Sequence, residues 1–488
     1  MLGKPLPPVA SCPLSAEERY SVTLAQPSFK TKYYHRRIGH LLRVERDRPA
    51  GTRDVPELIV LEPEAGVTPS SKPPVRIFLG TEPAQHRAER VFVWSVLQHR
   101  DPARRYEIHL MKDLKGFNRL QWKTGFTAYR YAIPDLAGKT GRAIYNDVDQ
   151  IYLTDPAELF DLDMQGAGQM CITEKETAVM LLDCEKMAKI WHREDAERSE
   201  RHKFFRRRVQ AIDGMWRQLP GVWNSRDHEY EPGVSKLLHY TTLQMQPWRP
   251  FPKVLKYRDN PNGDVWFEME KAADAAGFTL FTEEHPSRRY EALVELYKTM
   301  HEEGSHLTNR PPEKTFNGKS LTEHVDRVAQ MIDESGAKTL LDYGSGKGKF
   351  YDPYPGEPAE SRYKSMKAWG DTRVTCYDPG YEPFSGPIEP AYDGVICTDV
   401  LEHITEEDIP WVLDKLFRHA KHFVYAVAAC YPAKKHLPNG QNAHCTVQPP
   451  GWWREQMEGA ARRNPGVKWQ LCAQLKGPFG KSNRVFRA

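Results

Sequence analysis

A short glycine-rich segment, LLDYGSGKGKF at residues 340–350, constrains the fold of this chain more than any other stretch. An apolar run leads into Asp342 and then into Gly344, Gly346 and Gly348, which predicts a buried strand that ends in a tight turn. Glycines at alternate positions let a ligand approach the backbone closely, because no Cβ stands in the way. The segment therefore predicts a nucleotide-binding loop at the carboxyl end of a strand in an α/β sheet.

Two further strand ends carry the polar groups that a nucleoside site needs. The strand-like run 373–377 ends at Asp378, and a carboxylate there can accept hydrogen bonds from two ribose hydroxyls. A third apolar run, YDGVICTDVLEHI at 392–404, places Asp399 at its end and Glu402 and His403 just beyond. Because carboxyl ends of parallel strands meet at one edge of a sheet, these groups predict one pocket.

This series of motifs resembles the class I S-adenosylmethionine-dependent methyltransferases, which have a Rossmann-like sheet. The resemblance covers about residues 315–488 and implies that the three glycines face the methionine and adenosine parts of the cofactor. It also implies that Asp378 binds the ribose, that Asp342 orients the loop or the cofactor amine, and that Asp399 borders the substrate. A dinucleotide oxidoreductase is the rival interpretation, but the LLDYGSGKG start and the DVLEH strand end favour the methyl donor.

Three interpretations of Glu402 and His403 stay open. They could shape the pocket wall, or His403 could act as a general base, because imidazole titrates near neutral pH. In a subset of the methyltransferases that this region resembles, such residues hold a divalent metal near the substrate hydroxyl; here Asp399, Glu402, His403 and His444 would supply the set. Oxygen and nitrogen ligands suit Mg²⁺ or Mn²⁺. Asp399, Glu402 and His403 are therefore the candidate catalytic residues.

An Asp-x-Asp pair marks a second candidate site, in GRAIYNDVDQIYLTDPAELF at 141–160. Asp147 and Asp149 directly follow a predicted strand, and residues i and i+2 of extended backbone point to the same side. Their carboxylates can converge on one hard cation. Arg130 lies upstream on a predicted helix, and His239 lies downstream in KLLHYTTLQMQPW.

Together these segments resemble the retaining nucleotide-sugar glycosyltransferases of the family 8 type, which have a GT-A fold. The resemblance spans about residues 73–255 and implies Mn²⁺ (or Mg²⁺) bound to the diphosphate of a nucleotide-sugar donor, with a UDP-sugar expected. The metal ligands that it implies are Asp147, Asp149 and His239. It also implies that Arg130 contacts the donor. Gln246 stands where the family often has a lysine, which keeps open a non-catalytic sugar-recognition domain.

Length, charge and cysteine usage limit the classes of protein that fit. A chain of 488 residues is too long for one ordinary core. Its net charge of +4 gives no overall field that favours nucleic acid or a membrane. The eight cysteines are scattered singly and no secretory signal is visible, which favours a reducing compartment. We therefore expect a cytoplasmic protein that has no transmembrane segment and binds no nucleic acid.

Strands that alternate with helices predict an α/β fold in two domains. The first is a GT-A-like mixed sheet and the second is a Rossmann-like class I methyltransferase sheet. The predicted boundaries are an N-terminal extension at 1–72, a glycosyltransferase-like domain at 73–303, a linker at 304–314 and a methyltransferase domain at 315–488.

The sequence thus predicts a bifunctional enzyme that transfers a sugar from a nucleotide-sugar donor and O-methylates a glycan hydroxyl. The expected partner is a small-molecule or glycan substrate. The basic run 198–208 fits peripheral contact with a lipid-linked acceptor, although its interleaved acidic residues also fit a solvated helix face. Two alternatives stay open: an active methyltransferase with a sugar-recognition N-terminal domain, and a metal-dependent RNA methyltransferase.

Overall fold

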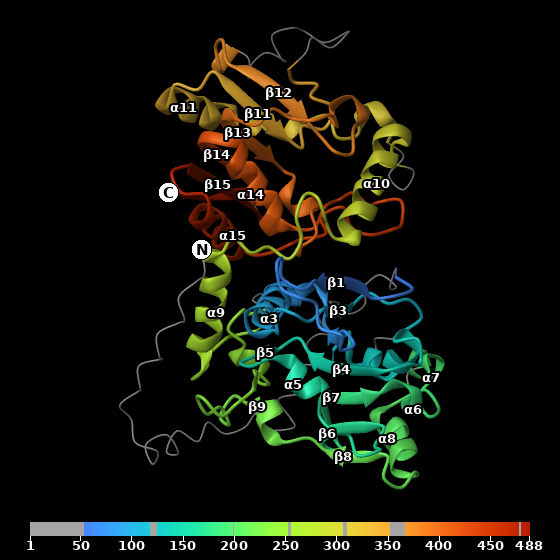
Figure 1. The fold of residues 1–488 in the computed structure, drawn as a ribbon. Helices are drawn as coiled ribbons and strands as arrows, with labels where there is room; N and C mark the ends of the chain where they lie inside the picture. The colour runs from blue at the N-terminus through green and yellow to red at the C-terminus, as the bar shows by residue number, and fades with distance from the viewer. Residues whose placement is uncertain are drawn as a thin grey trace. The chain divides into compact units, whose positions relative to one another are not determined.

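Three β-sheets organise the described part of the chain in a computed structural model (Figure 1). The described residues are 53–117, 124–198, 200–251, 255–305, 310–351, 367–477 and 480–488. Most of the predicted N-terminal extension, up to residue 52, lies outside these ranges. The described residues all fall within one compact unit, Pro49–Ala488. Their fold is mixed α/β, as the sequence predicts.

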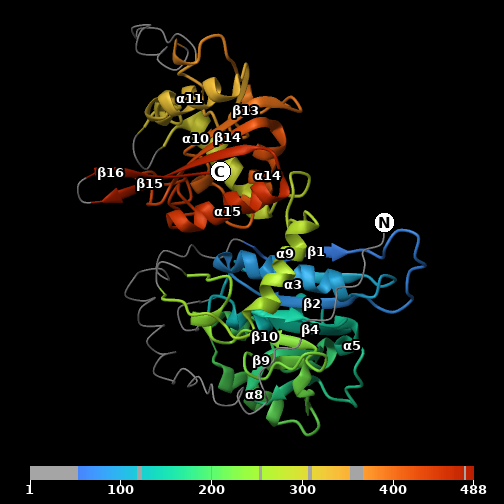
Figure 2. The ribbon, with the colours of Figure 1, turned by 90° about the vertical axis from the view of Figure 1, so that its left-hand side faces the viewer.

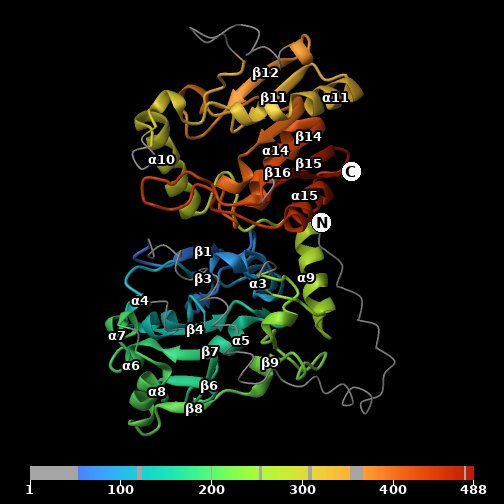
Figure 3. The same cartoon turned by 180° about the vertical axis from the view of Figure 1, so that it is seen from behind.

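The first sheet is mixed. Within the described ranges its seven strands lie in the order β1 (Glu57–Leu61), β3 (Tyr106–Met111), β2 (Val75–Gly80), β4 (Arg142–Asp147), β7 (Glu176–Asp183), β6 (Gln169–Thr173) and β8 (Trp216–Gln218). β2 pairs in parallel with β3 and β4, whereas β1 and β7 run antiparallel to their neighbours β3 and β4. Figure 3 shows β1 next to β3 and β7 next to β4. Most side chains of β2 and β4 are buried on both faces, which is typical of central strands in a covered sheet.

A small second sheet lies beside the carboxyl end of β4. It contains β5 (Gln150–Tyr152), β10 (Leu237–His239) and β9 (Ser225–Arg226) in that order. β10 runs antiparallel to β5, and His239 pairs with Gln150. This register brings a residue from far along the chain next to the turn that follows β4.

Helices and 3₁₀ turns cover these two sheets. They are η1 (Pro83–Gln85), α3 (His86–His99), η3 (Thr127–Ala132), α4 (Ile133–Leu136), α5 (Pro156–Phe160), α6 (Cys184–Met187), α7 (Arg193–Glu197), α8 (His202–Gln210), η4 (Gly221–Asn224), η5 (Leu243–Met245) and α9 (Gly263–Ala275). The basic run 198–208 contributes to α8, where Phe205 is buried and Arg208 pairs with Asp195. Within the described ranges, no helix of the chain has both the length and the apolar character needed to span a bilayer.

The third sheet is almost entirely parallel. Its six described strands lie in the order β12 (Arg373–Tyr377), β11 (Thr339–Tyr343), β13 (Tyr392–Thr398), β14 (Ala420–Ala429), β15 (Lys468–Gly477) and β16 (Gly480–Arg487). Only β16 is antiparallel to its neighbour, and Figure 2 shows it beside β15 as a hairpin.

Helices cover both faces of this sheet. The elements are α10 (Arg288–Glu303), η7 (Pro312–Lys314), η8 (Lys319–Glu323), α11 (Val325–Ser335), η9 (Glu382–Phe384), η10 (Leu401–His403), α14 (Ile409–His419) and α15 (Pro450–Arg463). Leu340 packs in one cluster with Val328 of α11, whereas the next residue, Leu341, packs in another with Leu413 of α14. Adjacent strand residues face opposite sides, so the sheet is doubly wound and its ligands are expected at the carboxyl ends of its strands.

Helix α10 packs against residues that belong to the region of the third sheet. Its residues Leu293 and Met300 form a small buried cluster with Leu437 and Ala443. The sequence grouped this helix with residues 73–303, but its buried face contacts residues that follow the predicted linker. The boundaries themselves stay a prediction.

Candidate functional site

The Asp-x-Asp pair and the distant histidine come together at the carboxyl end of β4. One ligand-type atom from each of Asp147, Asp149 and His239 lies within 4.8 Å of the others. Asp147 is the last residue of β4, and the pairing of β10 with β5 carries His239 to the same place. His239 Nε2 is 3.1 Å from Asp149 Oδ1. Two carboxylates and one imidazole at this spacing fit one divalent cation.

A chain of hydrogen bonds fixes the orientation of His239. Its Nδ1 lies 2.7 Å from Asn224 Oδ1, and Asn224 Nδ2 donates to Glu176 Oε1 at 2.9 Å. Because the amide oxygen of Asn224 can only accept, His239 donates from Nδ1. Its Nε2 faces Asp149, where it donates when the ring is protonated and offers its lone pair to a metal ion when the ring is neutral. A partner of this kind on the far ring nitrogen is typical of metal-binding histidines.

Arg130 and Gln246 hold the two carboxylates. Arg130 is buried, and its guanidinium donates to Asp147 Oδ1 at 2.9 Å and to Thr177 O at 2.6 Å. These bonds make it a support for Asp147, and a contact with the donor stays a prediction. Gln246 Nε2 donates to Asp149 Oδ2 at 3.1 Å, so Gln246 orients the second carboxylate.

The electrostatics of this triad favour added positive charge. Burial raises the pKa of Asp147, Arg130 opposes that rise, and the neighbouring Asp149 adds to it. Burial lowers the pKa of His239, but the carboxylates of Asp149 and Asp147 outweigh burial, so the net pKa is raised. Burial is thus the largest cause of the Asp147 shift, whereas the two carboxylates cause the net shift of His239, and a proton or a metal ion between these groups would be stabilised by them.

The glycine loop and the acidic strand ends line one pocket of the third sheet. The predicted residues on its wall are Asp342, Gly344, Gly346, Gly348, Asp378, Asp399 and His403. Gly344 and Gly346 have φ values of 77° and 57°, in the left-handed region. A Cβ on Gly344 would lie 2.3 Å from Val400 Cγ2, and one on Gly346 would lie 2.2 Å from Phe316 O. The loop therefore requires glycine at these positions for its own packing.

Two carboxyls of the pocket are bound to its loop. Asp378 Oδ2 accepts a hydrogen bond from Gly346 N at 2.9 Å, which ties the loop to the end of β12. Asp342 Oδ2 accepts from Tyr351 Oη at 2.7 Å. Burial raises the pKa of Asp378 to about 6 and that of Asp342 to about 7. Such groups sit in a desolvated pocket, as expected of residues that meet a ligand.

A second triad combines two residues that follow β13, Glu402 and His403, with His444 from farther along the chain. Ligand-type atoms of Glu402, His403 and His444 lie within 4.8 Å of one another. His403 Nδ1 lies 2.8 Å from Ala443 O, and His444 Nδ1 lies 2.6 Å from Tyr431 O. A carbonyl oxygen only accepts, so each histidine donates from Nδ1 and keeps its Nε2 lone pair for another partner.

Glu402 is the least satisfied group of this triad. It is fully buried, and within the described ranges neither carboxylate oxygen accepts a well-formed hydrogen bond. Burial, with the nearby Asp399, raises its pKa well above the usual range. Ionising a buried carboxyl group of this kind is costly, and a divalent cation would stabilise its charged form.

Asp399 and His403 both line the glycine-loop pocket, and only His403 also belongs to the triad. The four-residue metal set implied by resemblance reduces to three, because Asp399, which has a φ of 54°, is outside the cluster. Burial raises the pKa of Asp399 to about 6. Burial and His444 lower the pKa of His403 to about 3, which makes it a weak base at neutral pH.

Sequence reasoning missed two aromatic residues of α10 that enter the pocket. Tyr297 Oη lies 2.8 Å from His403 Nδ1 and donates to Ala443 O at 2.7 Å, and His301 lies on the pocket wall near Asp378. The spacing of these two residues could have indicated them, because aromatic side chains at positions i and i+4 share one face of a helix.

The comparisons with known proteins give little more. No protein-family model matches the chain, and no curated protein matches it. The apo structure of the bifunctional glycosyltransferase WbbM is 11% identical over 42% of this chain, with a TM-score of 0.29. The chain spans about half of that structure, 53%. The galactosyltransferase LgtC, in complex with donor and acceptor sugar analogues, is 11% identical over 43% of this chain and 98% of its own, with a TM-score of 0.30.

A third similar structure is the glycosyltransferase GlyE of Streptococcus pneumoniae TIGR4. It is 14% identical over 73% of this chain and 91% of its own, with a TM-score of 0.31. Similarities of this size establish neither the fold nor the activity of the chain, and the functional argument depends on its own residues.

Proposed function

We propose that the chain is a metal-dependent transferase that moves a sugar from a nucleotide-sugar donor. The observation that carries this proposal is the convergence of Asp147, Asp149 and His239 within 4.8 Å, with His239 fixed by Asn224. A Mn²⁺ or Mg²⁺ ion bound there would neutralise the diphosphate leaving group and act as a Lewis acid. The fit rests on the chemistry of the donor set, two carboxylates and one imidazole whose ligand atoms lie within 4.8 Å of one another.

The residues around this triad have separate tasks in the proposal. Arg130 holds Asp147 in place, and Gln246 holds Asp149. Asn224 keeps the His239 Nε2 lone pair directed at the site. These supports preorganise the ligands, so that little rearrangement is needed when the donor binds.

The test is metal-dependent release of UDP from a panel of UDP-sugars by the purified chain. Asp149→Asn should abolish release, while Asp213→Asn, a substitution of an exposed aspartate, should leave it unchanged. Calorimetry with UDP and Mn²⁺ separates the sugar-recognition alternative, which predicts metal-dependent binding without release. Equal release by the wild type and Asp149→Asn would refute the proposal.

A separate observation favours a second activity, S-adenosylmethionine-dependent methylation at the third sheet. Glu402, His403 and His444 form a metal-type set next to a pocket that holds the glycine loop and Asp378. We propose that the loop and Asp378 bind the nucleoside. A divalent ion held by the triad would orient an acceptor hydroxyl and lower its pKa. Both activities in one chain support a glycan as the shared substrate, O-methylated at a hydroxyl.

This second activity has its own test. S-Adenosylhomocysteine should bind the wild type by calorimetry and bind Asp378→Asn far more weakly. Labelled methyl transfer to oligosaccharides, compared with short single-stranded RNA, separates the glycan proposal from the RNA alternative. We also propose a cytoplasmic location, supported by the absence of a disulfide among the cysteines of the described ranges.

A further inference from the structure

The pocket beside the glycine loop has one wall that the doubly wound sheet does not supply. Helix α10 provides Tyr290, Leu293, Val294, Tyr297 and His301 to its lining. These residues recur at the three- and four-residue spacing of one helix face. The sheet alone would leave this side of the pocket open, so α10 completes it.

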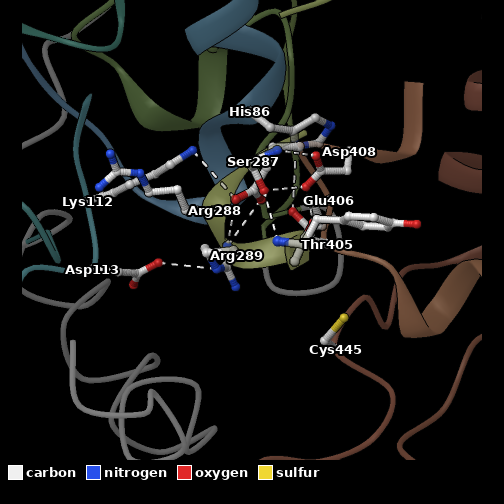
Figure 4. A network of polar contacts seen from close by, with 12 residues as sticks. His86, Lys112, Asp113, Ser287, Arg288, Arg289, Thr405, Glu406, Asp408 and Cys445 are labelled. Carbon is white, nitrogen blue, oxygen red and sulfur yellow. Dashed lines mark hydrogen bonds and ion pairs between the residues drawn. The ribbon is translucent and has the colours of Figure 1, made fainter. Parts of the chain in front are cut away.

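The N-terminal end of α10 is fixed by a buried polar network (Figure 4). Ser287 caps the helix by accepting from Tyr290 N, and its own N and Oγ donate to Asp408 at 2.9 and 2.5 Å. Arg289 donates to Glu407 at 3.1 Å, and Lys112 Nζ lies 3.6 Å from the same carboxylate. Lys112 and Glu407 are almost fully buried, so the helix is held at a defined position.

His301, near the other end of α10, is a buried polar group turned toward the pocket. Only 6% of it is exposed, and its ring stacks on Tyr381 at a centroid distance of 5.0 Å. Its Nε2 lies 3.9 Å from Asp378 Oδ1, too far for a hydrogen bond. Its Nδ1 has no hydrogen-bond partner within the described ranges. Nε2 is the ring nitrogen on the side of Asp378, and its distance from that carboxylate leaves room for one bridging ligand atom.

His301 is neutral in this setting. Burial, with smaller contributions from Lys347 and Lys435, lowers its pKa to about 4. The neutral ring therefore offers one N–H donor and one acceptor lone pair. Asp378, on the facing side, offers acceptor oxygens when it is ionised.

We propose that His301 binds the sugar ring of the nucleoside together with Asp378. A hydroxyl oxygen about 2.8 Å from both atoms would fit the 3.9 Å gap between His301 Nε2 and Asp378 Oδ1. That hydroxyl accepts from His301 Nε2–H and donates to the Asp378 carboxylate. The inference rests on the proposed nucleoside site and assigns it a ribose-specific residue from outside the doubly wound sheet.

Calorimetry with S-adenosylhomocysteine tests the assignment on the full chain. His301→Phe keeps an aromatic ring on Tyr381 but removes both ring nitrogens, and its dissociation constant should rise about tenfold. His301→Gln keeps a donor and should lose less. His422→Phe is the matched control, because His422 is exposed on β14 and should change nothing.

Deoxynucleosides separate hydrogen bonding from packing. Wild type should bind adenosine about tenfold more tightly than at least one of 2′-deoxyadenosine and 3′-deoxyadenosine, and His301→Phe should lose that preference. Unchanged binding in His301→Phe, or an unchanged preference for the hydroxyl, would overturn the inference while leaving the nucleoside site intact. A wild type that binds neither S-adenosylhomocysteine nor adenosine would overturn both.

Discussion

The two acid–histidine triads use similar side chains but differ in how their charges are compensated. In the first, Arg130 and Tyr145 both donate to Asp147, and Gln246 donates to Asp149. In the second, Glu402 is fully buried without a well-formed hydrogen bond in the described ranges. The protein therefore compensates most of the first site, leaving Asp149 Oδ1 without a well-formed hydrogen bond in the described ranges, whereas it leaves both oxygens of Glu402 so.

The histidines show the same difference. Carboxylates raise the pKa of His239, whereas burial lowers the pKa of His403 to about 3 and also lowers that of His444. Two neutral imidazoles next to a buried carboxylate form a ligand set that is ready for a cation. The two triads thus contain similar residue types, but the pKa values of their histidines are shifted in opposite directions.

The largest expected effect follows from removing a ligand of the preorganised triad. Asp149→Asn keeps the shape of the side chain but loses a charge, so release of UDP from a UDP-sugar should fall by at least about 100-fold. The assay is nucleotide release at saturating Mn²⁺, with Asp213→Asn as the control. A loss of less than about threefold would mean that this triad is no donor site.

The next prediction contrasts carboxylates by their effect on stability in the presence of a chelator. Asp147→Asn should lower the free energy of unfolding by about 2–4 kcal/mol, because buried Arg130 loses its partner. Glu402→Gln should change it by less than about 1 kcal/mol, because a neutral amide replaces a buried carboxyl group that has no ion-pair partner.

Denaturant unfolding measures both variants, and Mn²⁺ then sharpens the contrast. The metal should stabilise the wild type more than Glu402→Gln. If Glu402→Gln destabilised the chelated protein as strongly as Asp147→Asn, Glu402 would have a hidden internal partner and the comparison between the triads would fail.

The triads should also respond in opposite directions to acid. His403 has a folded pKa of about 3 against a usual 6.5, so its contribution to stability is present above pH 6.5 and is lost as the pH falls toward 3. The raised pKa of His239 has the opposite sign: its contribution is present below pH 6.5 and is lost as the pH rises through the folded value.

Unfolding in chelator at pH 7.5, 6.5 and 5.5 measures this contrast. The stability difference between wild type and His403→Gln should shrink by about 1 kcal/mol per unit below pH 6.5. The difference between wild type and His239→Gln should hold or grow over the same range. Parallel trends in the two variants would show that the histidines share one environment.

The last prediction concerns the support of His239 and removes no ligand. Asn224→Ala removes the acceptor of His239 Nδ1–H and should weaken Mn²⁺ binding by about tenfold, without removing a ligand. Calorimetric titration with Mn²⁺ gives the affinity, and Asn224→Asp should restore most of it. Unchanged affinity in Asn224→Ala would show that β10 alone positions the ring.

Local patterns predicted the parts of these sites that depend on local chemistry. Asp147 and Asp378 lie at strand ends, where the strand patterns predict them. The spacing of glycines in 344–348 identified a loop in which all three glycines have positive φ values. Alternation of strands and helices predicted the mixed α/β fold, which the structure confirms. Each of these features is set within about ten residues of sequence.

Other features depend on contacts between distant segments, which no local pattern reports. The antiparallel register of β10 on β5 brings His239 to Asp149, and the unsatisfied state of Glu402 is a property of its whole surroundings. The packing of α10 was missed for the same reason, because its partners Leu437 and Ala443 lie far downstream. The position of Asp399 on the glycine-loop pocket, outside the second metal-type set, likewise depends on how distant segments pack.

The network at the start of α10 also has a consequence for how the chain is made. Ser287 and its acceptor Asp408 are 121 residues apart, and Arg289 and Glu407 are 118 residues apart. During synthesis, Lys112 and Arg289 leave the ribosome long before Glu407 arrives to share their charge. Contacts that span so much chain form late and slow the folding of the regions they join. Truncation before residue 404 would therefore leave α10 without its cap partner, and we expect such fragments to aggregate.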